Sequence, residues 1–410
     1  MSDQTFRINA GYILPVTSPV IQNGSILINN GRIQFIGREN DCPEVAPHQV
    51  SSYPNHLLMP GLVNAHTHLS LSNLKNKTKG AICFVDWIKE IILHSNSMTD
   101  LDEKDAVKKG IKKLISSGTT TIGDISGSGV SMELMRDMKL RGVVFLEIIG
   151  FKKSMKNDQM NWIDRFLRLS KSNGQVTCGL SPHAPYSVSP QLIQSAYHLA
   201  KSEQLPLAMH IAETVDELEF IEKGEGALRR FLEDRGKWEP DWKPQKKSPI
   251  KYLESLNVLK GITGIHLNHM NDEDLKIIKK KNMSVVYCPK SNQWFQRKGP
   301  YPLMKFLKNK INVAVGTDSL ASNDKLNMFE ELTLIKTDFP DINDKILLQM
   351  ATINGAKALG LENVTGSLET GKKADIIALK INRDDNIYKS IFSAGGDIAF
   401  SMVEGEMIFP

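Results

Sequence analysis

The feature that most constrains the fold lies in the middle of the chain, where eight short apolar segments alternate with longer segments of helical spacing. The apolar segments span residues 57–66, 119–126, 143–150, 176–183, 205–213, 262–269, 283–289 and 311–318. Strands that alternate with helices predict βαβ units and a parallel sheet. Eight such units predict an α/β fold of the (β/α)₈ TIM-barrel type, and we assign residues 58–364 to it.

The two chain ends follow a different pattern. Residues 1–57 and 365–410 contain short apolar runs separated by glycine turns. Two of these runs flank Asn29-Asn30-Gly31, which is a hairpin signal. Because the two ends resemble each other in composition, we expect them to pair into one small β-sandwich domain, with the barrel inserted between them.

Charge and cysteine content exclude several classes of protein. The 410 residues carry a net charge of only +5, without a basic stripe of interleaved aromatics, which argues against nucleic-acid binding. The four cysteines are far apart, so neither a disulfide framework nor a cysteine zinc site is expected. No apolar run approaches the length of a transmembrane helix. We therefore expect a soluble, cytoplasmic protein without a membrane partner.

Side chains that can bind a metal stand at the ends of the predicted strands. In a barrel enzyme the carboxyl ends of the strands build the active site. Residues i and i+2 of a strand point to the same side, so His66 and His68 are both expected to face the barrel mouth. The other candidates follow the fourth, fifth, sixth and eighth strands, and they are His183, His210, Glu213, His266, His269 and Asp318.

Each candidate also has an ordinary structural explanation. A lone histidine at a strand end is usually structural or exposed, and an aspartate after Gly-Thr is often a helix N-cap. Four other histidines, at positions 48, 56, 94 and 198, are scattered without relation to the strand ends. Because the candidates instead recur at the same end of strand after strand, the sequence predicts a metal site.

The predicted ligands suit one divalent metal ion. Imidazole nitrogen and carboxylate oxygen favour Zn²⁺, and the same set admits Fe²⁺ or Mn²⁺. Such an ion lowers the pKa of a bound water towards 7. Glu213 lies three residues after His210 and points elsewhere, so we expect it to carry protons instead of binding the metal. No lysine ends the fourth strand, which favours one metal ion over a lysine-bridged pair.

Five motifs resemble those of the amidohydrolase superfamily, and most closely its branch of amino-purine deaminases and chlorohydrolases. They begin at Pro60, Ser181, His210, Cys288 and Gly316, and a further motif covers 366–375 near the end of the chain. The resemblance extends over nearly the whole chain. It implies a barrel, a small β-domain and a hydrolase of non-peptide carbon–nitrogen bonds.

The resemblance also implies a role for each residue at the strand ends. The metal ligands would be His66, His68, His210 and Asp318. Glu213 would be the general acid and base, while His266 would polarise the water or the substrate. His266 and Asp318 would also pass a proton to the departing amine, and His183 would contact the substrate. The sixth strand can be read in two registers, which leaves His269 as either a substrate contact or a loop histidine.

Three further stretches, namely residues 84–88, residues 145–147 and the loop 238–242 followed by 248–253, resemble the aminofutalosine deaminases of menaquinone biosynthesis. Those enzymes convert 6-amino-6-deoxyfutalosine to futalosine and release ammonia. We therefore expect Trp87, Glu147 and Ser319 to contact the substrate together with His183. Trp87 is equally explained as a core residue of an amphipathic helix. An acid such as Glu147 in an apolar strand is costly unless it is paired or lies at the barrel mouth.

Other substrates fit the same motifs. Deaminases of S-adenosylhomocysteine, methylthioadenosine and adenosine share most of them, and a cyclic amidohydrolase or a chlorohydrolase would use the same metal site. A non-catalytic scaffold would be expected to lose metal ligands, and none is missing here. In each enzymatic case the partner is a small molecule. A homodimer or a larger homo-oligomer is ordinary for the family.

Overall fold

Eight parallel strands form the predicted barrel in a computed structural model that describes residues 5–78, 83–169, 174–381 and 386–410. The strands are β5 (Leu62–Thr67), β6 (Thr119–Ser126), β7 (Arg141–Ile148), β8 (Val176–Pro182), β9 (Ala208–Ile211), β10 (Thr263–His266), β11 (Ser284–Tyr287) and β12 (Asn312–Val315). They pair in chain order as two four-stranded sheets. Bridges from Leu180 to Leu207 and from Thr67 to Asp318 join these sheets, which confirms the TIM barrel.

Both chain ends contribute to a second sheet of seven strands, so the expected pairing of the two ends is present as one mixed sheet, where the sequence suggested a β-sandwich. Its strand order is β15-β14-β13-β4-β1-β2-β3. The strands are β1 (Thr5–Ile13), β2 (Ile21–Asn29), β3 (Arg32–Arg38), β4 (Val50–Pro60), β13 (Ile376–Lys380), β14 (Ile398–Val403) and β15 (Glu406–Phe409). The predicted hairpin joins β2 to β3, where Asn30 and Gly31 have φ of +48° and +74°. Positive φ at both central residues is what a type I′ hairpin turn requires.

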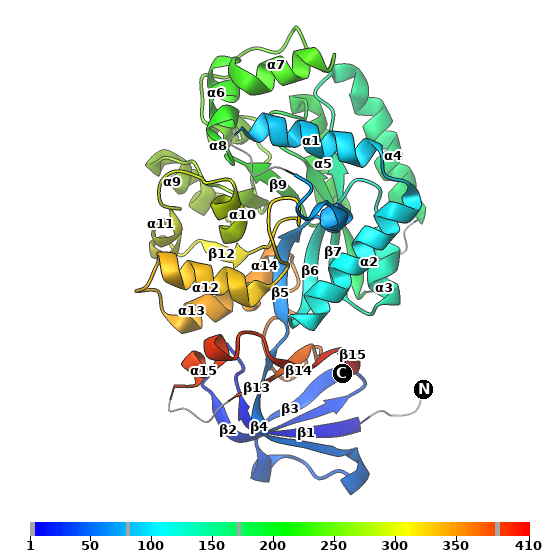
Figure 1. Cartoon of the computed structure of the whole chain (residues 1–410), viewed down its shortest axis with the longest axis vertical. Helices are drawn as coiled ribbons and strands as arrows, with labels where there is room; N and C mark the ends of the chain where they lie inside the picture. Colours follow the sequence, from blue (N-terminus) through cyan, green and yellow to red (C-terminus); the bar gives the residue numbers. More distant parts are fainter. Residues whose placement is uncertain (1–4, 79–82, 170–173, 382–385) are drawn as a thin grey trace.

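Helices surround the barrel, and most of them connect one barrel strand to the next (Figure 1). They are α1 (Phe84–Asn96), α2 (Asp100–Ser116), α3 (Ser131–Asp137), α4 (Lys156–Leu169), α5 (Pro190–Ser202), α6 (Val215–Lys223), α7 (Gly226–Asp234), α8 (Pro249–Ser255), α9 (Asp272–Lys280), α10 (Pro289–Trp294), α11 (Leu303–Lys308), α12 (Met328–Asp338), α13 (Asp344–Met350) and α14 (Ile353–Ala358). A further helix, α15 (Ile387–Ala394), connects β13 to β14 and lies beside the small sheet (Figure 1). Within the described residues, no helix has the length and apolar content needed to cross a membrane.

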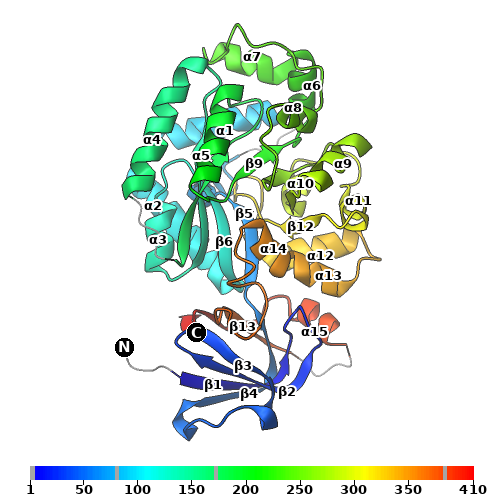
Figure 2. The ribbon, with the colours of Figure 1, turned by 180° about the vertical axis from the view of Figure 1, so that it is seen from behind.

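The apolar segment 57–66 crosses from one part of the molecule to the other. Residues up to Pro60 belong to β4 of the small sheet, and β5 of the barrel begins at Leu62. Gly61 separates the two strands, and a Cβ there would lie 2.0 Å from Thr120 Oγ1. β5 therefore runs away from the small sheet, and its carboxyl end lies on the side of the barrel where α1, α6 and α7 are found (Figures 1 and 2).

A buried ion-pair network joins the barrel to the small sheet. Arg141, the first residue of β7, has no exposed surface. Its Nε donates to Asp375 Oδ2 at 2.5 Å, and its Nη2 donates to Glu404 Oε1 at 2.8 Å. Asp375 and Glu404 belong to the C-terminal segment of the chain. These charges therefore fix the amino-terminal end of β7 in the barrel against the small domain.

Candidate metal centre and active site

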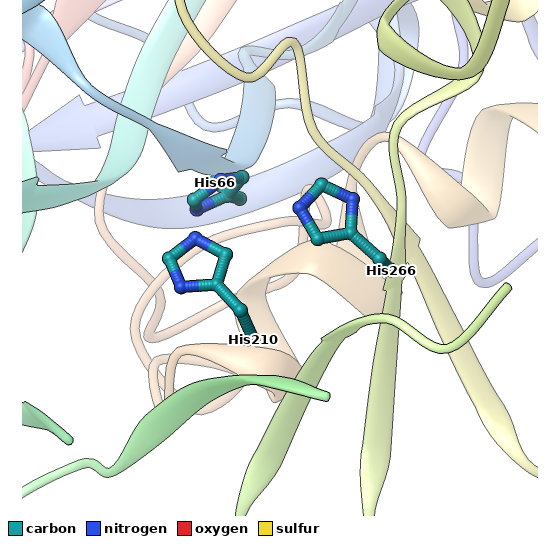
Figure 3. Close-up of side chains that lie close together, drawn as sticks. All are labelled: His66, His210 and His266. Carbon is teal, nitrogen blue, oxygen red and sulfur yellow. The ribbon is translucent and has the colours of Figure 1, made fainter. Parts of the chain in front are cut away.

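Five predicted side chains converge at the carboxyl ends of four barrel strands. His66 lies in β5 and His68 directly after it, His210 lies in β9, and His266 ends β10. Asp318 follows β12. The rings of His66, His210 and His266 point toward one another from three different strands (Figure 3). The i and i+2 spacing of His66 and His68 has the predicted effect, because both reach the same centre.

The distances between these side chains suit a single metal ion. His68 Nε2 lies 3.4 Å from His210 Nε2, and Asp318 Oδ1 lies 3.6 Å from His66 Nε2 and 3.9 Å from His68 Nε2. Two ligand atoms that each lie about 2.1 Å from one ion in tetrahedral geometry are about 3.4 Å apart. Two overlapping groups could hold an ion, namely His66 with His210 and His266, and His66 with His68 and Asp318.

The hydrogen-bonding state of these histidines also fits a metal. Both ring nitrogens of His66 are buried and have no hydrogen-bond partner among the described residues. Buried polar atoms in proteins are rarely left without a partner unless a water or an ion satisfies them. Burial lowers the pKa of His68 and of His266 to about 3, which keeps both rings neutral. The neutral imidazole is the form that binds metals.

Asp318 is held by three donors. Ser291 Oγ and Ser322 Oγ donate to its Oδ2 at 2.7 and 3.0 Å, and the Ser319 backbone N–H donates to its Oδ1 at 2.8 Å. Burial alone would raise the pKa of Asp318, but its interactions with His66, His266 and His68 together outweigh burial and hold the pKa well below the usual range. Asp318 is therefore an oriented carboxylate. Ser319, predicted as a substrate contact, is buried and serves this carboxylate in the structure.

The backbone beside the site adopts an unusual conformation. Ala212, His266, Leu267 and Asp318 all have positive φ, between +49° and +70°. Non-glycine residues adopt this left-handed region uncommonly, and each instance costs on the order of 1–3 kcal/mol. Such residues persist only where the surroundings fix them, and they cluster at functional sites. Their concentration here is an independent indication of function.

Glu213, the predicted proton carrier, lies beside the histidines but contacts them through one oxygen only. Its Oε2 lies 3.8 Å from His266 Nε2. Its Oε1 accepts a hydrogen bond from Arg297 Nη2 at 2.7 Å. Burial raises the pKa of Glu213 to about 7, against the opposing effect of Arg297. A carboxyl group with this pKa can hold or release a proton near neutral pH.

A cavity of about 640 Å³ opens above this centre. Its inner end is formed by polar side chains of the candidate site, namely His68, His183, His210, Glu213, His266 and Asp318. Its walls are largely apolar and include residues of α1 and α7, among them Trp87, Ile88, Ile91, Phe231 and Leu232. Charged side chains of both signs lie further out, on Asp100, Glu103, Arg235 and Lys237. The cavity can hold a ring at the polar end and a larger apolar group beyond it.

The remaining predicted substrate contacts are divided between the cavity and its surroundings. His183 and Glu147 both line the cavity, with 4.0 Å between His183 Nε2 and Glu147 Oε1. Burial raises the pKa of Glu147 to about 7 and lowers the pKa of His183 to about 4. Trp87 also lines the cavity, and its indole N–H donates to Ala321 O at 3.1 Å. His269 is not among the described residues that line the cavity, and His266 occupies the strand end instead.

Arg297, which no sequence pattern indicated, contacts the predicted acid and base. Arg297 lies in the loop after α10, well beyond the end of β11, so the rule that strand ends carry the site did not identify it. Glu217 was not predicted either, although the spacing Thr214-x-x-Glu217 at the start of α6 could have indicated it. That spacing is typical of a capping box.

Comparisons with known proteins agree with this geometry. Residues 57–407 match the Amidohydrolase family. The chain is 30% identical to the 5-methylthioadenosine/S-adenosylhomocysteine deaminase of Carboxydothermus hydrogenoformans, over 100% of this chain and 93% of that protein. It is 28% identical to the 5'-deoxyadenosine deaminase of Methanococcus aeolicus, over 93% of this chain and 89% of that protein.

A solved structure extends the likeness to the whole fold. The Helicobacter pylori aminofutalosine deaminase in complex with methylthio-coformycin superposes with a TM-score of 0.86 and 25% identity. The match covers 98% of this chain and 99% of that chain. The likeness to that structure therefore includes both the barrel and the small domain.

Proposed function

Because the chain belongs to the amidohydrolase family and is an aminohydrolase of non-peptide carbon–nitrogen bonds, we propose that it deaminates an adenine-type nucleoside. One observation carries the proposal. Glu213 lies within one cavity with the cluster of metal-binding side chains, and its second oxygen is directed toward His266. This arrangement supplies a proton carrier beside a metal centre, which hydrolytic removal of an amine requires.

The proposed substrates are 5'-methylthioadenosine and S-adenosylhomocysteine. A relative with that activity in its name matches the full length of this chain. The apolar walls of the cavity fit a thioether substituent, and the charged side chains further out, such as Asp100 and Arg235, fit the ammonium and carboxylate groups of the homocysteine arm. These matches favour methylthioadenosine and S-adenosylhomocysteine over aminodeoxyfutalosine, which the sequence motifs suggested.

Aminodeoxyfutalosine is the second candidate. The likeness to the Helicobacter pylori aminofutalosine deaminase supports it, at 25% identity. The cavity supports it as well, because aromatic and aliphatic walls lead from the polar end toward Arg235 and Lys237. An aromatic arm with a carboxylate would fit such walls. A role in menaquinone biosynthesis depends on this second candidate.

In the proposed mechanism His66, His68, His210 and Asp318 would hold one Zn²⁺ ion, which when bound supplies hydroxide near neutral pH. A carbon–oxygen bond forms at the ring carbon that bears the exocyclic amine, and the carbon–nitrogen bond to that amine breaks. Glu213 takes one proton of the attacking water and delivers it to the adjacent ring nitrogen. His266 and Asp318 pass the second proton of that water toward the departing amine, so that ammonia leaves and a carbonyl group remains on the ring. His183 orients the base, and Glu147 accepts hydrogen bonds from the sugar.

Ammonia release from purified protein tests the proposal, together with the change in purine absorbance. The panel contains methylthioadenosine, S-adenosylhomocysteine, 5'-deoxyadenosine, adenosine and aminodeoxyfutalosine. We expect turnover of the first two, lowered by about 100- to 10,000-fold in Glu213→Gln and retained in Glu222→Gln, which makes the same change on the exposed face of α6. Turnover of aminodeoxyfutalosine alone would support the second candidate. Carboxylate or halide release from cyclic amides or chlorinated rings, without ammonia from any nucleoside, would reject the deaminase.

A further inference from the structure

Arg297 forms a partly buried ion pair with the proposed acid and base of the reaction. Its Nη2 lies 2.7 Å from Glu213 Oε1, and the two side chains are 15% and 8% exposed. A charged hydrogen bond of this length is among the stronger polar contacts in a protein. The pair is therefore a fixed feature of the site.

Aromatic rings hold the guanidinium in this position. Its central carbon lies 4.5 Å from the ring centre of Phe295 and 5.3 Å from that of Phe84. Both distances fall within the range of cation–π attraction. The two rings also contact each other, with 5.7 Å between their centres. Arg297 is thus held by one ring from its own loop and one ring from α1.

The contact leaves Glu213 with one oxygen for chemistry. Oε1 accepts from Arg297, whereas Oε2 lies 3.8 Å from His266 Nε2. Glu213 lines the cavity, and Arg297 is not among the described residues that do so. Arg297 consequently lies behind the carboxylate as seen from the cavity, where it contacts Glu213 without reaching the space that a substrate would occupy.

We propose that Arg297 is a positioning residue for the deamination: it anchors Glu213 Oε1 so that Oε2 faces the reacting atoms. This inference rests on the proposed function. Proton transfer requires the carboxylate within hydrogen-bond reach of the ring nitrogen, and a displacement of about 1 Å can reduce a rate by about 100-fold. The side chain of Glu213 has several rotatable bonds, so an anchor on one oxygen restricts it to the productive orientation.

The test compares Arg297→Met, which removes the charge but keeps an apolar stem, with Arg297→Lys, which keeps the charge. We expect Arg297→Met to lower kcat by about 10- to 100-fold with little change in KM. Arg297→Lys should recover part of this loss. Arg165→Met is the control, since Arg165 is exposed on α4. Metal content and the unfolding midpoint identify a variant that has failed to fold, and Arg297→Gln then replaces Arg297→Met.

A double variant distinguishes positioning from a general structural role. If Arg297 acts through Glu213, adding Arg297→Met to Glu213→Gln should lower the residual kcat by less than about 2-fold, because effects of residues that act as a unit are not additive. If Arg297→Met instead lowers kcat in the Glu213→Gln variant by as large a factor as it does alone, the proposal is overturned. An unchanged kcat in Arg297→Met, or a rise confined to KM, would also overturn it. Absence of nucleoside turnover by the unmodified protein would instead reject the proposed function, and the positioning role with it.

Discussion

The carboxylate of Glu217 accepts hydrogen bonds from two consecutive backbone N–H groups, those of Ala212 at 2.9 Å and Glu213 at 3.0 Å. Ala212 has a φ of +50°, so Glu217 holds a left-handed turn between His210 and Glu213. Glu217 is completely buried in the first turn of α6, and the Thr214 side chain caps the same helix. One buried carboxylate thus fixes the turn that joins a proposed metal ligand to the proposed proton carrier.

Replacing Glu217 with Ala should therefore damage both stability and activity. The two N–H groups would lose their acceptor inside the protein, and a buried donor without a partner costs about 1–3 kcal/mol. Glu217→Gln keeps one carbonyl oxygen and should be milder than Glu217→Ala. Urea unfolding and kcat measure the two effects. Equal behaviour of Glu217→Ala and the exposed control Glu222→Ala would contradict the role of this carboxylate.

Metal removal should destabilise the protein as well as inactivate it. An ion that binds only the folded state, present at 100 times its Kd, stabilises that state by about 2.7 kcal/mol. A chelator should lower the unfolding midpoint of the unmodified chain, and added Zn²⁺ should restore midpoint and activity. In His210→Asn the chelator should change the midpoint little, while the exposed control His198→Asn should respond like the unmodified chain. A chelator effect of equal size in His210→Asn would place the ion elsewhere.

The convergence of the candidate metal site could be predicted from the sequence because topology enforces it. Once the eight segments are assigned to parallel strands, their carboxyl ends meet at one face, and His66, His210 and His266 must approach one another. Of the two registers considered for segment 262–269, the structure has the one that places His266 at the strand end, because His266 is the last residue of β10. Secondary structure and topology sufficed for these residues.

The contacts of Glu213 could not be predicted in the same way. Arg297 reaches it across the site from an irregular loop, and its position depends on packing between Phe84 and Phe295, which lie far apart in the sequence. The division of segment 57–66 at Gly61 likewise depends on the close approach of Thr120. Such tertiary contacts have no local period in the sequence, so a pattern of strands and helices does not contain them.

The buried charge of Arg141 gives a prediction about the join between the two parts of the molecule. Arg141→Met leaves Asp375, which is also buried, without its partner, and removal of one member of a buried pair costs about 3–5 kcal/mol. A second change, Asp375→Asn, should recover part of the loss by removing the unpaired charge. Urea unfolding measures both. Lys139→Met, which breaks an exposed pair with Glu406, should cost less, and an equal cost would show that burial is not the cause.

Glu331 predicts a dependence of stability on pH. This completely buried side chain accepts hydrogen bonds from the Lys290 backbone N–H at 2.9 Å and from Asn323 Nδ2 at 2.7 Å. Burial raises its pKa from 4.5 to about 8. Between these values the folded chain retains a proton that the unfolded chain has released, so the contribution of Glu331 to the free energy of unfolding falls as pH rises.

Glu331→Gln removes this titration and keeps one acceptor oxygen. Below pH 4.5 the Glu331 carboxyl group of the unmodified chain is neutral in both the folded and the unfolded state. Removing its titration therefore does not raise the free energy of unfolding of the variant in that range. As the pH increases toward 8, the stability of the variant should rise relative to that of the unmodified chain, by up to about 1.4 kcal/mol for each unit of pKa shift. Urea midpoints at low and high pH measure this difference. The exposed control Glu222→Gln should show a constant difference, and the same constancy in Glu331→Gln would contradict the raised pKa.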